Sequence, residues 1–318
     1  MLGIWLDDEP RLRDDLALPT PAAHEALLRV RLAGVCATDL ELTRGYHHFR
    51  GVLGHEFIGE IAEAPGAPER VGERIAGEIN IRCGSCPECD AGRPAHCRRR
   101  RAAGIRDHDG AFAEYLCLPL ENLHPVPEDV PDEAAVFAEP LAAALEIPQQ
   151  VHVGPGLRVV VIGAGRLGQL IVRVLRLSGC DLSVVARHPA QRALLGAVGV
   201  PWIDETAVAE RDADLVVEAS GSPGGFALAR RAVRAGGCIV LKSTYRGSLE
   251  TDLSSLVVDE ITLTGSRCGP FPAALRLLAG GLVDPTPLIT ARYPLADGLA
   301  ALRHAAEPGA MKVLLDCR

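Results

Sequence analysis

The sequence has 318 residues, of which 48% are hydrophobic and 23% are charged, and its formal net charge is −8. This length and composition exclude a disordered chain and are typical of two globular domains. The negative net charge argues against a general partner of nucleic acids or of anionic membranes. The one basic run, Arg98–Arg101, is too short to reverse this balance.

The amino-terminal residues carry acidic side chains where a signal peptide needs an apolar core. No apolar run approaches the roughly 18 residues of a membrane-spanning helix. We therefore expect a cytoplasmic protein that does not enter the membrane. In a reducing compartment its ten cysteines indicate thiols and metal ligands rather than disulfides.

The first 130 or so residues read as short strands separated by glycines and prolines, which indicates an antiparallel β domain with functional loops. The alternation of apolar and polar side chains predicts strands at Ala26–Leu32, Ile58–Ala64 and Arg74–Ile79.

From Pro131 onward the pattern changes to alternating helices and strands, which predicts an α/β fold with a doubly wound parallel sheet. A helix is expected first, over Glu133–Gln149. The elements expected after it are strands at 157–162, 182–186, 215–219, 238–241 and 261–264, and helices at 167–178, 190–197, 225–234 and 272–279. Residues 289–318 hold a further helix and an apolar strand, Lys312–Leu315, whose return to the first domain the sequence does not prove.

Cys36 and the pair His55–Glu56 stand among glycines in two loops about 20 residues apart. Thiolate and imidazole are common zinc ligands, and a catalytic zinc takes three protein ligands and leaves one position open. From these residues alone two interpretations remain: a catalytic zinc site that lacks its third ligand, or a buried structural cysteine with a core histidine.

Four cysteines follow in the spacing C-x2-C-x2-C-x7-C, at Cys83, Cys86, Cys89 and Cys97. This pattern favours a closed structural zinc site, which holds a loop together and does no chemistry. An iron–sulfur cluster is disfavoured, because the ferredoxin run has a gap of only three residues before its last cysteine and a proline after it. Disulfide pairing is disfavoured by the expected compartment.

The stretch Val159–Gly168 reads as a strand, the glycine pattern G-x-G-x-x-G and the start of a helix, which in this context is a dinucleotide fingerprint. Its glycines permit a tight turn, close approach of a pyrophosphate and close helix packing. The expected cofactor-binding residues of this turn are Gly163, Gly165, Arg166, Leu167 and Gly168.

The residues at the end of the second strand of this unit indicate whether the cofactor is NAD(H) or NADP(H). An NAD site places an acidic residue there, whereas here Ala186 is followed by Arg187 and His188. A guanidinium without a competing carboxylate favours NADP(H) over NAD(H). The alternative is an arginine that points outward from a helix cap.

These segments, together with GAFAEY at Gly110–Tyr115, occur in the order found in the zinc-dependent medium-chain dehydrogenase/reductases, the alcohol dehydrogenase superfamily, which the chain resembles over nearly its whole length. The resemblance implies a GroES-like β-rich catalytic domain, a Rossmann domain and an active site between them. We expect the catalytic domain at 1–146 and 283–318 and the NAD(P)-binding domain at 147–282.

The segment Phe137–Leu141, FAEPL, is similar to that of the sorbitol, threonine and glucose dehydrogenase branch, which implies Glu139 as the third ligand of the catalytic zinc, directly or through water. A helix-surface glutamate is the alternative. By the same resemblance Glu56 lies behind the metal and can move onto it.

The resemblance also gives roles to the neighbours of these ligands. Asp39 matches a carboxylate that orients His55. Thr38 matches the hydroxyl beside the substrate oxygen, and the alternative is that Thr38 is only a turn residue. His47 and His48 are candidates for the last step of a proton relay, and nothing in the sequence selects between them.

The implied activity is a zinc-dependent, NAD(P)-linked transfer of hydride between an alcohol, polyol or sugar and the corresponding aldehyde or ketone. The alternatives are a zinc-free quinone reductase of the same superfamily and a non-catalytic protein that senses NADP. The expected partners are a small-molecule substrate and further copies of the chain, in a homodimer or a homotetramer.

Overall fold

The computed structural model describes residues 1–244 and 248–318, which form two compact units. One unit comprises Met1–Glu139 and Phe271–Arg318, and the other comprises Pro140–Pro270. Within the described residues no helix is long and apolar enough to cross a bilayer.

The expected domain boundaries fall later in the chain than the boundaries between these units. Residues 271–282 belong to the first unit because α9 (Phe271–Ala279) packs on α3 (Asp132–Ala135) and the Phe271 ring stacks on His124 at 5.0 Å. Residues 140–146 belong to the second unit, where Lys242 Nζ donates to the Ala143 carbonyl at 2.7 Å. The functions expected of the two domains remain predictions.

The first unit contains a sheet in the order β10-β6-β5-β3-β18-β17, with β9 also paired to β3. Its strands are β3 (Glu25–Gly34), β5 (Glu56–Glu63), β6 (Arg74–Gly77), β9 (Tyr115–Pro119), β10 (Leu123–Pro125), β17 (Ile289–Pro294) and β18 (Lys312–Asp316). A smaller sheet, β2-β1-β4, combines β1 (Gly3–Leu6), β2 (Pro10–Arg13) and β4 (Gly51–Val52).

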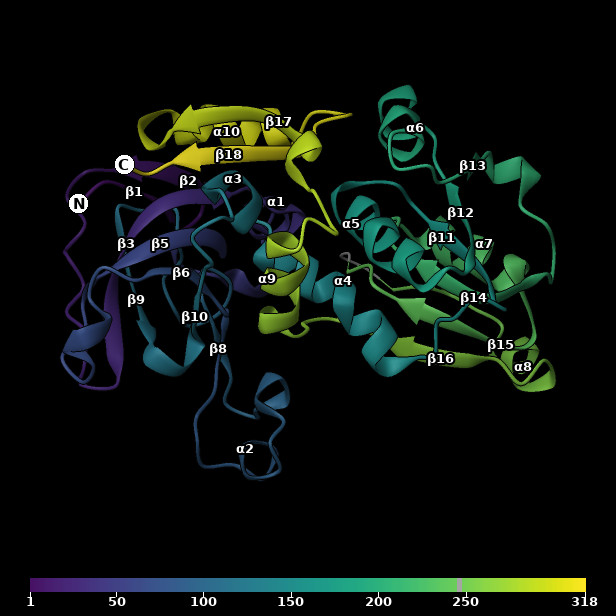
Figure 1. Ribbon diagram of the computed structural model, residues 1–318, viewed down its shortest axis with the longest axis horizontal. Coiled ribbons are helices and arrows are strands. Elements are labelled where there is room, and N and C mark those ends of the chain that lie inside the picture. Colours follow the sequence, from purple (N-terminus) through teal and green to yellow (C-terminus); the bar gives the residue numbers. More distant parts are fainter. Residues whose placement is uncertain (245–247) are drawn as a thin grey trace. The chain divides into compact units, whose positions relative to one another are not determined.

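The carboxyl-terminal segment returns to this first sheet, as β18 pairs antiparallel with β3 and parallel with β17. The helix α10 (Gly298–Ala305) covers both of these late strands (Figure 1). Residues from both ends of the sequence therefore share one core, in which Leu28, Val30, Val313 and Leu315 are completely buried. The strand β17 was not predicted from the sequence.

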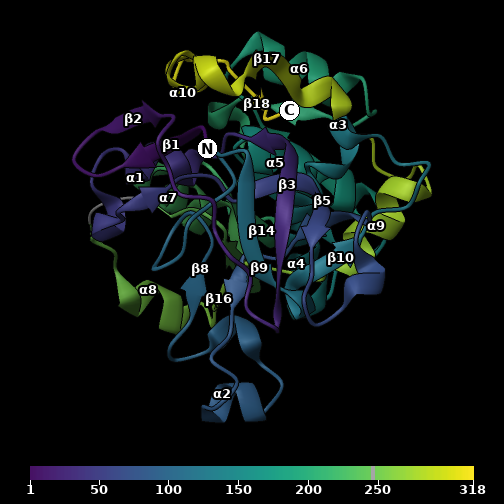
Figure 2. The same ribbon diagram turned by 90° about the vertical axis from the view of Figure 1, so that its left-hand side faces the viewer.

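The four-cysteine segment forms a lobe that extends from the short hairpin of β7 (Asn80–Ile81) and β8 (Arg101–Ala102). Figures 1 and 2 show its helix α2 (Pro87–Asp90) standing away from the sheets of the same unit. Its buried residues are the cysteines themselves, so the lobe has almost no apolar core.

The helix predicted over Glu133–Gln149 is two helices, α3 and α4 (Ala138–Gln150), because the chain breaks at Val136 and Phe137. Both residues at the break are buried, which indicates that tertiary packing overrides the local preference for one helix. Pro140 is tolerated because it stands in the first turn of α4, where a backbone N–H has no partner within the helix.

The second unit is a parallel six-stranded sheet in the order β13-β12-β11-β14-β15-β16, which confirms the predicted doubly wound arrangement. Its strands are β11 (Arg158–Ile162), β12 (Asp181–Val185), β13 (Trp202–Ile203), β14 (Ala213–Glu218), β15 (Val233–Leu241) and β16 (Thr262–Gly265), and its helices are α5 (Arg166–Leu175), α6 (Pro189–Gly196), α7 (Pro223–Ala232) and α8 (Leu253–Val258). The strand order reverses between β12 and β14, on either side of β11, and ligands of such sheets bind where the order reverses.

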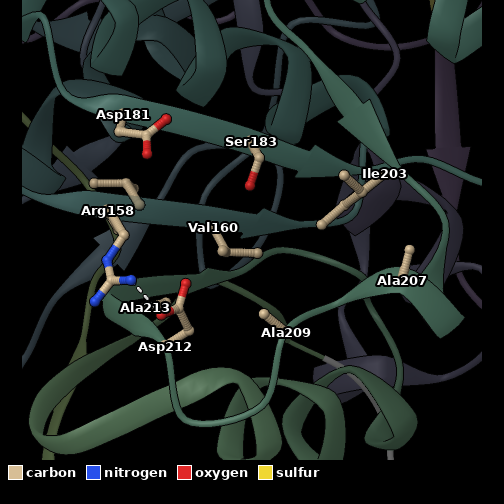
Figure 3. A pocket seen from close by; sticks show the side chains of 10 residues that line it. Arg158, Val160, Asp181, Ser183, Ile203, Ala207, Ala209, Asp212 and Ala213 are labelled. Carbon is tan, nitrogen blue, oxygen red and sulfur yellow. Dashed lines mark hydrogen bonds and ion pairs between the residues drawn. The ribbon is translucent and has the colours of Figure 1, made fainter.

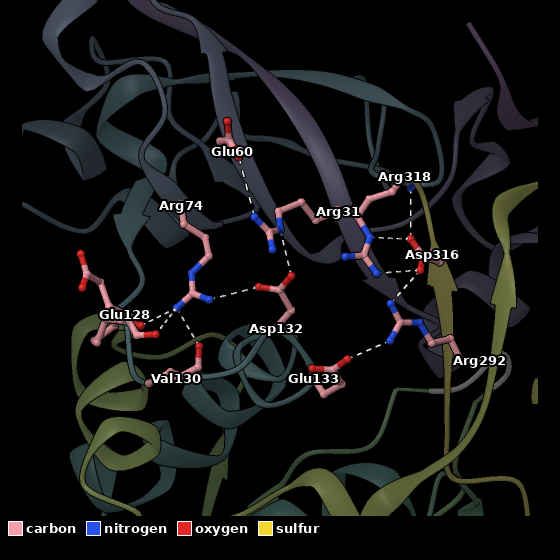
Figure 4. Close-up of polar contacts among 11 residues, drawn as sticks. Arg31, Glu60, Arg74, Glu128, Val130, Asp132, Glu133, Arg292, Asp316 and Arg318 are labelled. Carbon is pink, nitrogen blue, oxygen red and sulfur yellow. Dashed lines mark hydrogen bonds and ion pairs between the residues drawn. The ribbon is translucent and has the colours of Figure 1, made fainter.

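Ion pairs tie the strands of the first unit to its later segments (Figure 4). Asp132 accepts from Arg31 at 2.8 Å and from Arg74 at 3.3 Å. Asp316 accepts from Arg292 at 2.7 Å and forms a two-bond pair with Arg318. These arginines depress the pKa of the Asp316 carboxyl well below its usual value.

Candidate functional site

Cys36 lies between the end of β3 and the short helix α1 (Ala37–Leu42), and it is the N-cap residue of that helix. The Asp39 carboxylate accepts the backbone N–H of Cys36 at 2.8 Å, which fixes the loop that carries the thiol. The Thr38 hydroxyl lies 3.8 Å from the Cys36 sulfur and is partly exposed. Two residues predicted to act on the substrate are therefore adjacent in the structure.

His55 precedes β5 and is 2% exposed. Its Nδ1 lies 3.2 Å from Asp39 Oδ1, and neither buried atom has a hydrogen-bond partner among the described residues, so the Asp39 carboxylate holds the loop of Cys36 by a hydrogen bond and meets the ring of His55 as a charge contact. The other ring nitrogen, Nε2, is then left for a metal ion, as in the usual carboxylate–histidine–metal arrangement. The preceding Gly54 has a φ of 98° and packs against the Phe112 ring, which a Cβ at this position would approach to 2.3 Å.

Cys36, His55 and Glu56 form one group whose donor atoms all lie within 4.8 Å of one another. A thiolate, an imidazole and a carboxylate are normal zinc ligands, and a tetrahedral zinc site separates its donors by roughly 3.3–3.8 Å. The donor set and its spacing therefore fit a zinc ion.

The electrostatics of this group favour a cation. Burial by itself lowers the pKa of His55, but the charges of Asp39 and Cys36 outweigh burial and raise this pKa well above the usual range. A site that stabilises an imidazolium so strongly also stabilises a metal ion, which would compete with the proton.

Glu139, the predicted third ligand, is not a member of the group that the described residues form. It is the second residue of α4, is partly exposed and has interaction partners of its own. His47 and His48 are exposed and lie in a tight turn with positive φ values of 60° and 49°. The roles of these three residues stay predictions.

Lys312 is a member of the site that sequence reasoning missed. Its ammonium forms an ion pair with Glu56 Oε2, and the two side chains are 3% and 1% exposed. The sequence signal was a polar residue at the start of an otherwise apolar strand, but its partner lies 256 residues earlier.

The four cysteines of the lobe converge as the spacing predicts, with all four sulfur atoms within 4.8 Å of one another. Cys86 Sγ lies 3.5 Å from Cys89 Sγ and 3.9 Å from Cys97 Sγ. A zinc–sulfur distance of about 2.3 Å places tetrahedral thiolates about 3.8 Å apart, so a zinc ion fits. None of the ten cysteines forms a disulfide within the described chain.

Backbone amides favour the thiolate form at two of these four cysteines, whereas burial raises the pKa of Cys89 to about 11. Backbone hydrogen bonding at Ser85 is the main cause that lowers the pKa of Cys83, to about 6, with burial opposing it. Backbone hydrogen bonds from Arg98 and Cys89 lower the pKa of Cys86. Thiolates are the form that binds metal.

The fingerprint glycines lie between β11 and α5, as predicted, and two of them are required by close backbone contacts. Gly163 has a φ of 102°, and a Cβ there would lie 2.7 Å from the Ala219 carbonyl oxygen. A Cβ on Gly168 would lie 2.0 Å from the Gly163 oxygen. A Cβ on Gly165 meets nothing within 4 Å, so the chain does not need a glycine there for its own packing.

Arg187 and His188 follow β12, and His188 is the N-cap of α6. The Arg187 guanidinium is exposed and forms an ion pair with Glu205 at 2.7 Å. An exposed pair of this kind contributes little energy, so an anion of higher charge can displace it.

The second unit also contains a cavity of about 220 Å³, which is drawn in Figure 3. It lies apart from the glycine turn between β11 and α5. Arg158, Asp181 and Ala213, which line it, are the first residues of β11, β12 and β14. Nucleotides bind to such sheets at the opposite, carboxyl ends of the strands. The cavity is therefore not the nucleotide site.

Residues 22–128 match the model of the alcohol dehydrogenase GroES-like domain. An L-threonine 3-dehydrogenase from Chelativorans sp. (strain BNC1) is 30% identical over 99% of this chain and 95% of its own length. The chain belongs to the zinc-type medium-chain alcohol dehydrogenase family. An L-galactonate-5-dehydrogenase from Escherichia coli (strain K12) is 29% identical over 88% of this chain and 87% of its own.

Solved structures of the family resemble this chain over its whole length. A Sinorhizobium meliloti 1021 protein with bound NADP has a TM-score of 0.90 and 29% identity, over 99% of this chain and 98% of its own. An alcohol dehydrogenase from E. coli CFT073 in complex with NADH has a TM-score of 0.91 and 28% identity, over 99% of both chains. The predicted family, fold class and dehydrogenase activity are confirmed.

Proposed function

We propose that the protein is a zinc-dependent dehydrogenase that transfers hydride between an alcohol, polyol or sugar, or the corresponding carbonyl compound, and NADP(H). The observation that carries this proposal is the donor group of the half-buried Cys36 and the buried His55 and Glu56, with Asp39 behind it. Relatives named for threonine and galactonate support a small hydroxylated substrate.

Cys36 and His55 supply two ligands of the catalytic zinc, Glu139 supplies the third, directly or through water, and Glu56 lies behind the metal. Glu139 is implied by the resemblance to its branch, whereas Glu56 is the carboxylate that shares the group with the other two. A zinc ion bound here acts as a Lewis acid that lowers the pKa of a hydroxyl group. Cys83, Cys86, Cys89 and Cys97 hold a second, structural zinc.

The residues around the ligands position groups and move a proton. Asp39 fixes the tautomer and orientation of His55. The Thr38 hydroxyl, beside Cys36, takes the proton of the substrate hydroxyl. From there the proton leaves toward solvent, with the exposed His47 or His48 as the last carrier.

Metal analysis tests the two-zinc proposal. The purified protein is expected to contain two zinc ions per chain, and Cys36→Ser and Cys97→Ser are each expected to lose one of them. Only Cys36→Ser should abolish turnover in a panel of polyols, sugars and aldehydes, while its affinity for the nucleotide stays unchanged. Full activity of Cys36→Ser would contradict the catalytic role.

The preference for NADP(H) is supported by Arg187 and by the absence of an acidic residue at Ala186. Solved relatives hold either NADP or NADH, so kinetics must decide. We expect kcat/KM to be higher with NADPH than with NADH, and Arg187→Ser to lower only the NADPH value, by about 10–100-fold. Arg176→Ser, which removes an exposed arginine elsewhere in the unit, is the control.

We also propose a homodimer or homotetramer in the cytoplasm. The edge strand β16 and the neighbouring α8 expose apolar side chains, with Val257 75% and Val258 80% exposed, which supports association through this part of the second unit. Light scattering during size-exclusion chromatography measures the mass, and a monomer at micromolar concentration would contradict the proposal.

A further inference from the structure

The two lysines of this chain, Lys242 and Lys312, are both buried. Lysine and arginine total 33 residues, so 31 are arginine, and every other position that needs a basic side chain uses a guanidinium. Lys242 and Lys312 are 8% and 3% exposed. An ammonium is a compact point charge, whereas a guanidinium grips a carboxylate with two parallel bonds.

The two buried lysines have different partners. The partners of Lys242 include neutral oxygen atoms, the carbonyls of Ala143 at 2.7 Å and Arg267 at 2.9 Å and the Ser266 hydroxyl at 3.2 Å. Lys312 instead faces a carboxylate, Glu56, that belongs to the candidate metal group. The position of Lys312 therefore affects how much negative charge the candidate metal group presents to a cation.

The sheet builds the contact between Lys312 and Glu56. The strand β3 lies between β5 and β18, with Gly34 opposite Glu56 on one side and Leu314 on the other. A Cβ on Gly34 would lie 2.9 Å from Glu56 Oε2 and 3.2 Å from Lys312 Cδ. Because Gly34 has no side chain, there is room beside it for the Glu56 carboxylate and the Lys312 ammonium to come into contact.

The Phe137 ring helps to hold the ammonium, since its centroid lies 5.4 Å from Lys312 Nζ. An ion pair in such an environment is weak support for stability, because removing both charges from water costs about as much as their attraction returns. Stability alone thus gives little reason for this pair to exist here.

The charges of the site suggest what the pair does. Cys36, Glu56 and Asp39 contribute three negative charges as ionised groups and Glu139, as the proposed third ligand, contributes a fourth, whereas a zinc ion with Lys312 contributes three positive ones. Without Lys312, the Glu56 carboxylate has the zinc ion as its nearest cation. The Glu56 carboxylate would then coordinate the zinc ion permanently and occupy the coordination position that the substrate needs.

We propose that Lys312 is a positioning residue that restrains Glu56, so that this carboxylate stays beside the metal without becoming its permanent ligand. This inference rests on the proposed catalytic zinc at Cys36 and His55. It deepens that proposal by naming the side chain that keeps a coordination position available.

The test is the zinc affinity of metal-depleted protein, measured by competition with a chromophoric chelator, for wild type and Lys312→Met. We expect Lys312→Met to bind zinc at the Cys36 site at least fivefold more tightly and to turn over at least tenfold more slowly. Lys242→Met is the matched control, because it removes the other buried ammonium and should leave zinc affinity unchanged.

The background variant Glu56→Gln separates restraint from simple charge repulsion. If Lys312 acts through Glu56, Lys312→Met should change zinc affinity by less than twofold when Glu56→Gln is already present. A gain that persists in this background, or a zinc affinity of Lys312→Met that is unchanged or weaker, would overturn the proposal.

A second variant covers the case in which Lys312→Met does not fold without metal. Gly34→Ala inserts a methyl group between the two charges and should also tighten zinc binding, and unchanged affinity there contradicts the proposal. A failure of the proposed function is recognised separately, because Cys36→Ser would then retain the zinc that wild type holds at this site.

Discussion

A single carboxylate, Asp39, organises the candidate metal group from behind. It is fully buried, accepts the backbone N–H of Cys36 with one oxygen and faces the His55 ring with the other. Both predicted ligands therefore depend on the same side chain, which makes Asp39 the most informative residue to change without touching a ligand.

We predict that Asp39→Asn folds but loses about 10–100-fold in zinc affinity at this site, because an amide neither orients the imidazole in the same way nor increases its basicity. The measurement is competition with a chelator, alongside kcat/KM. The exposed Asp14→Asn is the control. Unchanged zinc affinity in Asp39→Asn would show that the ring is oriented by other contacts.

The sequence predicted Cys36, His55 and Asp39 together, because each lies within a short segment whose spacing or resemblance points to metal chemistry. It could not predict Lys312, whose role depends on a strand pairing that brings it beside Gly34 and Glu56. Glu139 shows the opposite case, since its segment resembles a known ligand segment while the described donor group does not include it.

At the scale of elements, the turn between β11 and α5 separates glycines that the fold needs from one that a ligand needs. Gly163 and Gly168 are each held against backbone atoms, whereas Gly165 faces open space. The glycine pattern therefore reflects two requirements, close backbone packing within the fold and space for a ligand, and substitutions can distinguish them.

We predict that Gly165→Ala keeps the Tm of wild type but weakens NADPH binding at least tenfold, because the added methyl group stands where the pyrophosphate approaches. Gly168→Ala should instead lower the free energy of unfolding by roughly 2 kcal/mol or more, because its Cβ meets the Gly163 oxygen. Thermal unfolding without nucleotide and fluorescence titration with it measure the two effects. A loss of stability in Gly165→Ala would contradict the assignment.

The four-cysteine lobe gives a third prediction, because it has little besides its sulfur atoms to hold it folded. Removal of zinc with a chelator should unfold the lobe around the largely exposed run Arg98–Arg101 and speed tryptic cleavage there by at least tenfold, because a protease cuts flexible chain. Cys97→Ser should be cleaved as fast without a chelator, whereas Cys36→Ser should resist like wild type. Mass spectrometry of the fragments locates the cut.

Element prediction succeeded where local patterns decide and failed where packing decides. Five strands and three helices of the second unit were predicted from alternating apolar segments and glycine turns, and the structure confirms them, whereas β13 and α8 were not predicted. The break between α3 and α4 carries no glycine or proline at Val136 and Phe137, and it depends on their burial. The strand β17 alternates between half-buried and exposed residues, so its apolar signal is weak.

At the scale of the whole molecule, the ion pairs of Figure 4 connect α3 with the early strands of the first unit through Asp132 and with the late strand β17 through Glu133. Asp316 is the centre of one such group, with Arg318 as the main partner and Arg292 as the second, and its side chain is 25% exposed. Because the folded protein depresses its pKa, this carboxyl stabilises the fold wherever it is ionised in both states.

We predict that Asp316→Asn lowers the free energy of unfolding by about 1 kcal/mol at neutral pH. The sign follows from the depressed pKa: the contribution is complete above about pH 4 and is lost as the pH falls toward the folded-state pKa. Urea denaturation of wild type and variant between pH 2.5 and 7 measures it, with the exposed Glu307→Gln as control. A difference that stays constant down to pH 2.5 would contradict this assignment.

The late arrival of β18 in the sheet sets an order of events during biosynthesis. When a ribosome has made Cys36, His55 and Glu56, the second unit must still be translated before Lys312 emerges, 256 residues after Glu56. Until then β3 has an open edge and Glu56 has no ammonium beside it. The nascent chain therefore carries a half-built, electron-rich centre for several seconds or more at ordinary rates of elongation. An ion captured during that interval would meet a different set of charges from the one that the finished enzyme presents.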